Sequence, residues 1–386
     1  MKQQPPQQGT TLASGSSSSS SSSVASRSSL SRNHTGWFDD AQNCILEEVI
    51  RQNNGKPFTI QETEQAQELM KLLSTSADTK GIKFSSTALH YQYYQSKFKK
   101  RALLMYQVLM SVWNTEFVTN FKKKNNAFNE RTIYERVNQM LEKKKGQWSL
   151  REFSELATLT LILSTRSTSS AIKMTNISDQ NDDELDVARS PCLLTIPVMR
   201  EFTEVNISSE ARHLRIASLG GGPGNDGAAF VVLKETLLSK LFEKGTIIES
   251  DLYDLEKNWK NYLEKLQEIT KDSLVLNFNR CDVTKSLENS LNRALKDRIV
   301  EYDIFLFSYV CNETSHLTKQ SEGLFFKELF TYSKPFSIFI FTDVIEHAKK
   351  ALLYIEDLTR KVNSKFVTFH LSSNQAQVML VIKCSV

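Results

Sequence analysis

Apolar side chains recur every three or four residues between Trp37 and Ser164, the spacing that places them on one face of a helix. The clearest stripe consists of Tyr94, Phe98, Ala102, Met105, Leu109 and Val112, and similar stripes lie at 46–50, 66–73, 133–141 and 153–163. Pro57 is the only proline in this stretch, so nothing interrupts long helices. The pattern predicts an all-α N-terminal domain over residues 36–170.

After Leu193 the pattern changes to apolar runs of strand length that alternate with amphipathic helical segments. The runs are Leu214–Leu219, Thr246–Ser250, Leu274–Phe278, Tyr302–Tyr309, Phe336–Thr342, Phe366–Leu371 and Gln377–Cys384. Such alternation predicts an α/β fold, a seven-stranded doubly wound sheet of Rossmann-like type, over residues 193–386. Only Ser372–Ala376 separates the last two runs, so we expect a hairpin that makes the final strand antiparallel.

Two segments lack the apolar residues that a core requires. Residues 1–35 contain the serine run Ser16–Ser23 and no acidic residue, and we predict a disordered tail there. A targeting peptide is the alternative, because it is also serine-rich and acid-poor, but this segment has no amphipathic face. Residues 171–192 are acidic and polar, and we expect a linker or loop between the two domains.

Composition excludes several classes of protein. No apolar run approaches the roughly 20 residues that span a bilayer. The 5 cysteines are odd in number and contain no C-x-x-C pair, which excludes a disulfide scaffold or a zinc ribbon and suits a reducing compartment. We therefore expect a cytoplasmic or nuclear protein. The net charge of +4 is too small to indicate nucleic-acid binding by itself.

Glycine is scarce, 13 in all, yet the segment Gly220–Gly227 contains five of them, directly after the strand Leu214–Leu219. A tight turn whose backbone N–H groups approach a ligand requires glycine, and ligands of open α/β sheets bind at this end of the strands. Gly222–Gly227 also fits the dinucleotide pattern G-x-G-x-x-G, a weak signal alone. A dehydrogenase would need a second half and a substrate domain, for which no strands remain.

Residues 193–386 resemble a class I S-adenosylmethionine-dependent methyltransferase, because Gly220-Gly-Gly-Pro-Gly-Asn-Asp226 is similar to the G-G-G-P-G-[ST]-D motif of that family. The resemblance implies the strand order 3-2-1-4-5-7-6 and S-adenosyl-L-methionine as cofactor. It also implies cofactor contacts from the turn residues Gly220, Gly221, Gly222 and Gly224.

The resemblance further assigns roles to acids near this turn. Asp251, taken as the end of the second strand, would accept hydrogen bonds from the ribose hydroxyls. Asp282 would take the adenine amino group, with Cys281 or Val283 supplying a backbone N–H or an apolar wall. Ser218 stands where the family often has an acid, and Asp226 is the candidate to replace that charge. The ordinary alternative for an aspartate after a strand is a helix cap or a turn.

Candidates for the transfer step follow the fourth strand. Ser308 and Tyr309 would line the place where the methyl group meets its acceptor, and Ser308 would also border the cofactor. Asn312 and Glu313 end the strand toward the ligand crevice, and Glu313 either orients or deprotonates the acceptor or caps a helix. Cys311 is interpreted as buried filler and His316 as an exposed loop histidine. The segment lacks the tetrapeptide [DN]-P-P-[YFW] and the Pro-Cys pair of base-methylating enzymes.

Basic residues concentrate in the helical half, where residues 86–150 contain 12 Lys or Arg against 4 Glu. The clusters are Lys97, Lys99, Lys100, Arg101; Lys122, Lys123, Lys124; and Lys143, Lys144, Lys145. Phosphate backbones are drawn to such surfaces, although solvated helix faces have the same composition. We therefore expect a methyltransferase that acts on RNA. The alternatives are a small-molecule enzyme with a helical lid and an inactive binding module with the same fold.

Overall fold

The computed structural model describes residues 34–75, 86–113, 130–143, 148–164, 166–167, 212–239, 246–270, 273–372 and 376–385. The serine run, the acidic segment 171–192 and the cluster Lys122–Lys124 lie outside these ranges, so what was expected of them remains a prediction. Within these ranges no helix is both long and apolar enough to cross a membrane.

A central sheet has the strand order β4-β3-β2-β5-β6-β8-β7, with β1 paired to β2 beside this path. The strands are β1 (Arg166–Ser167), β2 (Arg212–Leu219), β3 (Thr246–Asp254), β4 (Val275–Arg280), β5 (Ile304–Ser308), β6 (Ile338–Asp343), β7 (Lys365–Ser372) and β8 (Gln377–Ser385). β8 runs antiparallel to both neighbours, whereas β2 to β6 are parallel. Counted from β2, this order is 3-2-1-4-5-7-6, and the predicted fold class is confirmed. The two-residue β1 was not predicted.

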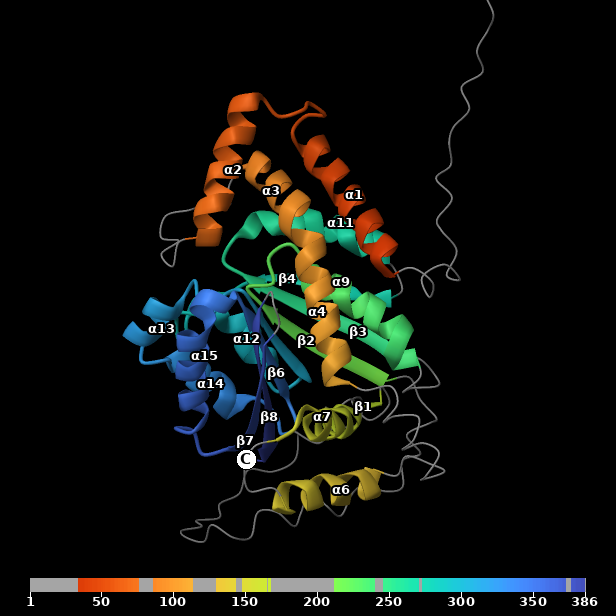
Figure 1. The fold of residues 1–386 in the computed structure, drawn as a ribbon, viewed down its shortest axis with the longest axis vertical. Coiled ribbons are helices and arrows are strands. Elements are labelled where there is room, and N and C mark those ends of the chain that lie inside the picture. Colours follow the sequence, from red (N-terminus) through yellow and green to blue (C-terminus); the bar gives the residue numbers. More distant parts are fainter. Residues whose placement is uncertain are drawn as a thin grey trace, which may run out of the picture.

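Each strand contributes to two cores because successive side chains point to opposite faces of the sheet. On one face Ile304 and Leu306 join a core shared with α4, α7 and α9. On the other face Phe305 stacks on Phe339 at 4.9 Å between ring centroids, and these rings join a core with α12, α14 and α15 (Figure 1). The sheet is therefore covered on both faces, as expected of a parallel sheet.

The helices of the sheet region are α9 (Asn225–Leu233), η3 (Lys234–Leu238), η4 (Lys257–Trp259), α11 (Lys260–Thr270), η6 (Ser290–Asn292), α12 (Arg293–Arg298), α13 (Ser315–Gln320), α14 (Leu324–Tyr332) and α15 (Ile345–Thr359). The preceding helices are α1 (His34–Gln52), α2 (Ile60–Thr75), α3 (Thr87–Tyr93), η1 (Tyr94–Phe98), α4 (Lys99–Val112), α6 (Glu130–Lys143) and α7 (Leu150–Ser164). The long helix predicted from Tyr94 to Val112 begins with a π turn, η1, a feature often found at functional sites.

The described N-terminal helices share their core residues with the sheet region. α4 packs on α9 across one face of the sheet (Figure 1), and Val108 and Leu109 belong to the same core as Phe230. Tyr94 shares a second core with Leu263 of α11. The described N-terminal helices and the sheet region therefore share their cores, and the expected domain boundaries remain a prediction.

Candidate functional site

The glycine turn, Gly220–Gly224, connects β2 to α9 with a backbone that few other residues adopt. Gly220 has φ +68° and Gly222 has φ +38°, in the left-handed region that side chains disfavour. A Cβ on Gly220 would lie 2.7 Å from the Cβ of Val310, so the turn fits closely against the segment after β5. The Gly220 N–H also donates to the carbonyl of Tyr253 at 2.8 Å, near the end of β3.

The carboxylate beside this turn belongs to Asp254, the last residue of β3. Its Oδ2 accepts the Gly222 N–H at 3.0 Å, and its Oδ1 accepts the Glu256 N–H at 2.9 Å. Burial raises the pKa of Asp254 to about 6. The sequence pattern did not identify this residue because the strand was taken to end at Asp251, whereas the apolar pair Leu252-Tyr253 carries the strand onward.

Asp251 lies inside β3 with its side chain fully buried. Its carboxylate accepts hydrogen bonds from Arg298 and Tyr302, and from Asn277 Nδ2 at 2.8 Å. Because alternate residues of a strand point to opposite faces, Asp251 and Asp254 face different sides of the sheet. The assignment of the ribose contact to Asp251 is therefore wrong in geometry: this residue belongs to a buried polar network.

Asp226 joins the first turn of α9 to the ends of two strands. Its carboxylate accepts the hydroxyls of Ser218 at 2.7 Å and of Ser308 at 2.8 Å. Burial raises its pKa. Ser218, at the position where the family that the sequence resembles often has an acid, thus holds a carboxylate supplied by the helix. The neighbouring Asn225 is also buried, and its Oδ1 has no hydrogen-bond partner among the described residues.

Arg101 reaches this site from the helical half of the chain. Its guanidinium lies 3.9 Å from the ring centroid of Tyr309 and 5.2 Å from that of Tyr93, and its Nη1 donates to the Tyr93 hydroxyl at 2.5 Å. The basic residues at 97–101 therefore have different surroundings. Arg101 lies against the aromatic rings of the site, whereas Lys99 forms an ion pair with Asp39 at 2.5 Å. Arg101 thus lies partly buried against Tyr93 and Tyr309, and the RNA contact expected of this cluster remains a prediction.

The segment after β5 contains the predicted transfer residues. Tyr309 has φ +64°, an uncommon conformation for such a residue, and its N–H donates to the Thr342 carbonyl at 2.8 Å. Burial raises the pKa of Glu313 to about 7, although the charge of Arg101 opposes this. Glu313 does not cap a helix, because α13 begins after Thr314. The Asn312 N–H donates to Asp343 at 2.7 Å, which fixes the segment to the end of β6.

Two neighbouring predictions have different outcomes. Cys311 is buried in the aromatic core, as expected, and burial raises its pKa well above the ordinary value. His316 is not an exposed loop residue. It lies partly buried in α13, and its buried Nε2 has no partner among the described residues.

The segment after β4 closes the site near Asp254. The Cys281 N–H donates to the Asp254 carbonyl at 3.1 Å, so it is not free for a cofactor as the resemblance implied. The Asp282 Oδ1 accepts both the N–H and the hydroxyl of Thr284, at 3.0 and 2.6 Å. Asp282 thus forms the turn expected as its ordinary role, and its Oδ2 has no protein donor in the described residues. Val283 is buried.

An aromatic cluster covers the glycine turn, and sequence patterns did not identify its position. The Tyr94 hydroxyl donates to the Pro223 carbonyl at 3.2 Å. Trp259 Nε1 lies 3.4 Å from where a Cβ on Gly222 would stand, and its ring packs 5.6 Å from that of Tyr93. Trp259 is buried. The cluster encloses the turn with side chains from both halves of the chain.

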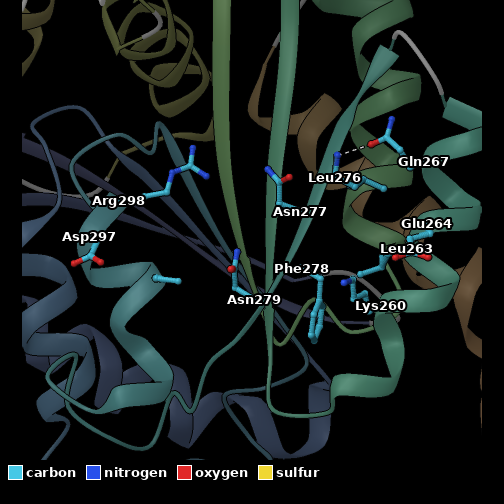
Figure 2. A pocket seen from close by; sticks show the side chains of 11 residues that line it. Lys260, Leu263, Glu264, Gln267, Leu276, Asn277, Phe278, Asn279, Asp297 and Arg298 are labelled. Atoms are coloured by element: carbon cyan, nitrogen blue, oxygen red, sulfur yellow. Dashed lines mark hydrogen bonds between the residues drawn. The ribbon is translucent and has the colours of Figure 1, made fainter. Parts of the chain in front are cut away.

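A separate cavity of about 740 Å³ lies at the edge of β4, between α11 and α12 (Figure 2). Gln267 covers part of this edge: its Oε1 accepts the Leu276 N–H at 2.6 Å, and its Nε2 donates to the Leu274 carbonyl at 2.7 Å. Arg298, which also lines the cavity, is already paired with Asp251. This cavity contains none of the residues of the glycine-turn site.

Comparison with known proteins finds no matching family model and no matching curated protein. Solved structures do match in part. A methyltransferase from Pyrococcus furiosus matches at 12% identity and TM-score 0.31, over 44% of this chain and 75% of that chain. An rRNA methylase from Streptococcus thermophilus matches at 13% identity and TM-score 0.28, over 45% of this chain and 88% of that chain. An S-adenosylmethionine-dependent methyltransferase from Clostridium acetobutylicum matches at 10% identity and TM-score 0.30, over 45% of this chain and 84% of that chain. These likenesses are distant.

Proposed function

We propose that this protein is an S-adenosylmethionine-dependent methyltransferase. The observation that carries the proposal is the pairing of the glycine turn with Asp254, at the carboxyl ends of β2 and β3 in a sheet of order 3-2-1-4-5-7-6. Ligands of open α/β sheets bind at this edge. A carboxylate there presents two acceptor oxygens, the chemistry that suits a pair of ribose hydroxyls.

The remaining residues also suit this cofactor. The unpartnered Asn225 Oδ1 is an acceptor for an ammonium group beside the turn. Around Gly222 a Cβ would meet its nearest atoms at 3.4 Å, so the missing side chain leaves room for a ligand against the backbone. Asp282, whose Oδ2 has no protein donor among the described residues, is the acceptor proposed for an adenine amino group. S-adenosylmethionine, when bound, supplies an activated methyl group on a positively charged sulfur.

Glu313 is the proposed general base. Methyl transfer to an N–H or O–H acceptor releases a proton, and a base whose pKa lies near the working pH accepts it most effectively. The pKa of Glu313, raised to about 7, meets this condition. Tyr309 and Ser308 lie in the same segment, where they would position the acceptor.

We propose RNA as the acceptor on the basis of the excess of Lys and Arg over residues 86–150. A small molecule beneath the helices is favoured instead by the aromatic cluster, which encloses the turn with Tyr94 and Trp259. These acceptors are distinguished by radiolabelled methyl transfer into fractionated RNA, protein and small-molecule extracts, with Glu313→Gln as the inactive reference. Incorporation in no fraction, with cofactor binding intact, would indicate an inactive binding module.

Calorimetry with S-adenosylhomocysteine tests the cofactor. We expect the full chain to bind it, and Gly222→Arg to abolish binding because the long side chain fills the ligand's place. Gly55→Arg is the matched control, since Gly55 also has positive φ but a Cβ placed there would meet no atom within 4 Å. Unchanged affinity in folded Gly222→Arg would remove the site from the glycine turn. NADH binding of comparable strength would favour a dehydrogenase.

A further inference from the structure

Arg101 is a cation held at the glycine-turn site without an anionic partner. Among the described residues it donates to the Tyr93 hydroxyl, and no carboxylate lies within ion-pair distance. Three acids surround it. Asp226 is bonded by Ser218 and Ser308, and Asp343 by two backbone N–H groups. The charge of Arg101 lowers the pKa of Glu313, but these two side chains form no ion pair among the described residues. Arg101 is partly buried, and a charged group that loses water without gaining a partner is costly. This arrangement therefore indicates an anionic ligand.

The guanidinium is also oriented for such a ligand. The Cζ of Arg101 lies over the ring of Tyr309, 3.9 Å from its centroid, and this cation–π contact helps to hold the group in place. The five N–H donors of a guanidinium lie in one plane, and among the described residues one of them is used, by Tyr93. The remaining donors are free to form the paired hydrogen bonds that a planar carboxylate accepts.

The surroundings place opposite charges within one ligand. Tyr309 directly follows Ser308, whose hydroxyl bonds Asp226 in the first turn of α9. The orphan acceptor Asn225 Oδ1 is adjacent to Asp226 in the chain. An amino-acid group lying between these elements would direct its ammonium to the acceptors of α9 and its carboxylate to Arg101.

We propose that Arg101 binds the α-carboxylate of the methionine part of S-adenosylmethionine. This inference rests on the proposed function, and it adds a cofactor contact from the N-terminal helices. The other source of the same chemistry is an anionic group on the acceptor. Arginine rather than lysine suits the place, because its planar group both stacks on Tyr309 and binds a carboxylate with two hydrogen bonds.

The test compares S-adenosylmethionine with its decarboxylated analogue, which keeps the sulfonium and the ammonium, by calorimetry on the full chain. We expect the wild type to prefer S-adenosylmethionine. Arg101→Gln should weaken its binding by about 10- to 100-fold, the range for a hydrogen bond to a charged group, and should leave the analogue's affinity nearly unchanged. Lys100→Gln, an exposed neighbour with the same loss of charge, is the control and should alter neither.

Each other outcome is decisive. If Arg101→Gln weakens the binding of both compounds equally, Arg101 supports the site only through packing. If it weakens the binding of neither, Arg101 binds an anionic group of the acceptor and not the cofactor. Both results overturn the inference. If Arg101→Gln does not fold, the wild type still decides, because equal affinity for the two compounds overturns it. Failure of the wild type to bind either compound would instead refute the proposed function.

Discussion

Two aspartates three residues apart in β3 have opposite surroundings. Asp251 is bonded by Arg298, Tyr302 and Asn277 inside the protein. The donors to Asp254 among the described residues are backbone N–H groups beside the glycine turn. A carboxylate surrounded by side-chain donors stabilises the fold, and one held at a ligand-binding edge remains available to a ligand. We therefore expect Asp251 to have a structural role and Asp254 to bind the ligand.

Asp254→Asn should lower the affinity for S-adenosylhomocysteine by about 10- to 100-fold, because ribose hydroxyls lose a charged acceptor. Its folding should be retained. Asp251→Ala should leave affinity in the remaining folded protein unchanged but lower the free energy of unfolding by about 3 kcal/mol, since Arg298 loses a buried partner. Calorimetry and urea unfolding measure the two effects, and the reverse pattern would restore Asp251 as the cofactor acid.

Glu313 should make methyl transfer depend on pH. The carboxyl acts as a base only when ionised, so the rate should rise as pH increases through about 7, the raised pKa of this group. Glu313→Gln should reduce the rate by about 10²- to 10⁴-fold and remove this rise. Exposed Glu264→Gln is the control. A variant with an unchanged pH profile would exclude Glu313 as the base.

The same carboxyl should lower stability at neutral and higher pH. Its folded-state pKa, about 7, is above the ordinary 4.5, so its contribution to stability is present at low pH and lost as pH rises through 7. Glu313→Gln should therefore raise the free energy of unfolding at pH 8 by about 3 kcal/mol, with a much smaller gain near pH 4.5. Thermal unfolding of both proteins at the two pH values checks this, and a gain independent of pH would contradict it.

At the scale of elements, the glycine turn is fixed by what it contacts as much as by its own conformation. Gly220→Ala would bring a methyl group to 2.7 Å from the Cβ of Val310, in addition to the cost of the left-handed backbone, about 1 kcal/mol. Gly55→Ala has the same backbone cost with open space around it. We expect Gly220→Ala to lose clearly more unfolding free energy than Gly55→Ala, and Val310→Ala to restore part of the difference. Equal losses would show that crowding by Val310 is unimportant.

For the whole molecule, the shared cores predict that residues 193–386 do not form a stable domain alone. Removing the N-terminal helices would uncover the faces of α9 and α11 that pack against Val108 and Tyr94. It would also remove Arg101 from the site. The fragment should therefore be unfolded or aggregated by circular dichroism, and should not bind S-adenosylhomocysteine. A soluble fragment with full affinity would show that the two parts are separable domains.

Sequence alone determined the elements of this protein and part of its site. Strand-length runs, a short final hairpin and one concentration of glycine are local features, because side-chain period and backbone freedom depend on neighbouring residues. Together with the resemblance carried by Gly220–Asp226, they predicted the strand order. They also indicated that the segment containing Ser308 and Glu313 belongs to the site.

Only the tertiary structure decided which side chains meet. Arg101 and Tyr309 are far apart in sequence, and no periodic pattern distinguishes Arg101 from the lysines beside it. The length of β3 chose Asp254 over Asp251, because each added residue of a strand reverses the face to which the side chain points. The helices and the sheet form one unit because neither can bury its apolar faces alone, a property of packing that their separate patterns do not contain.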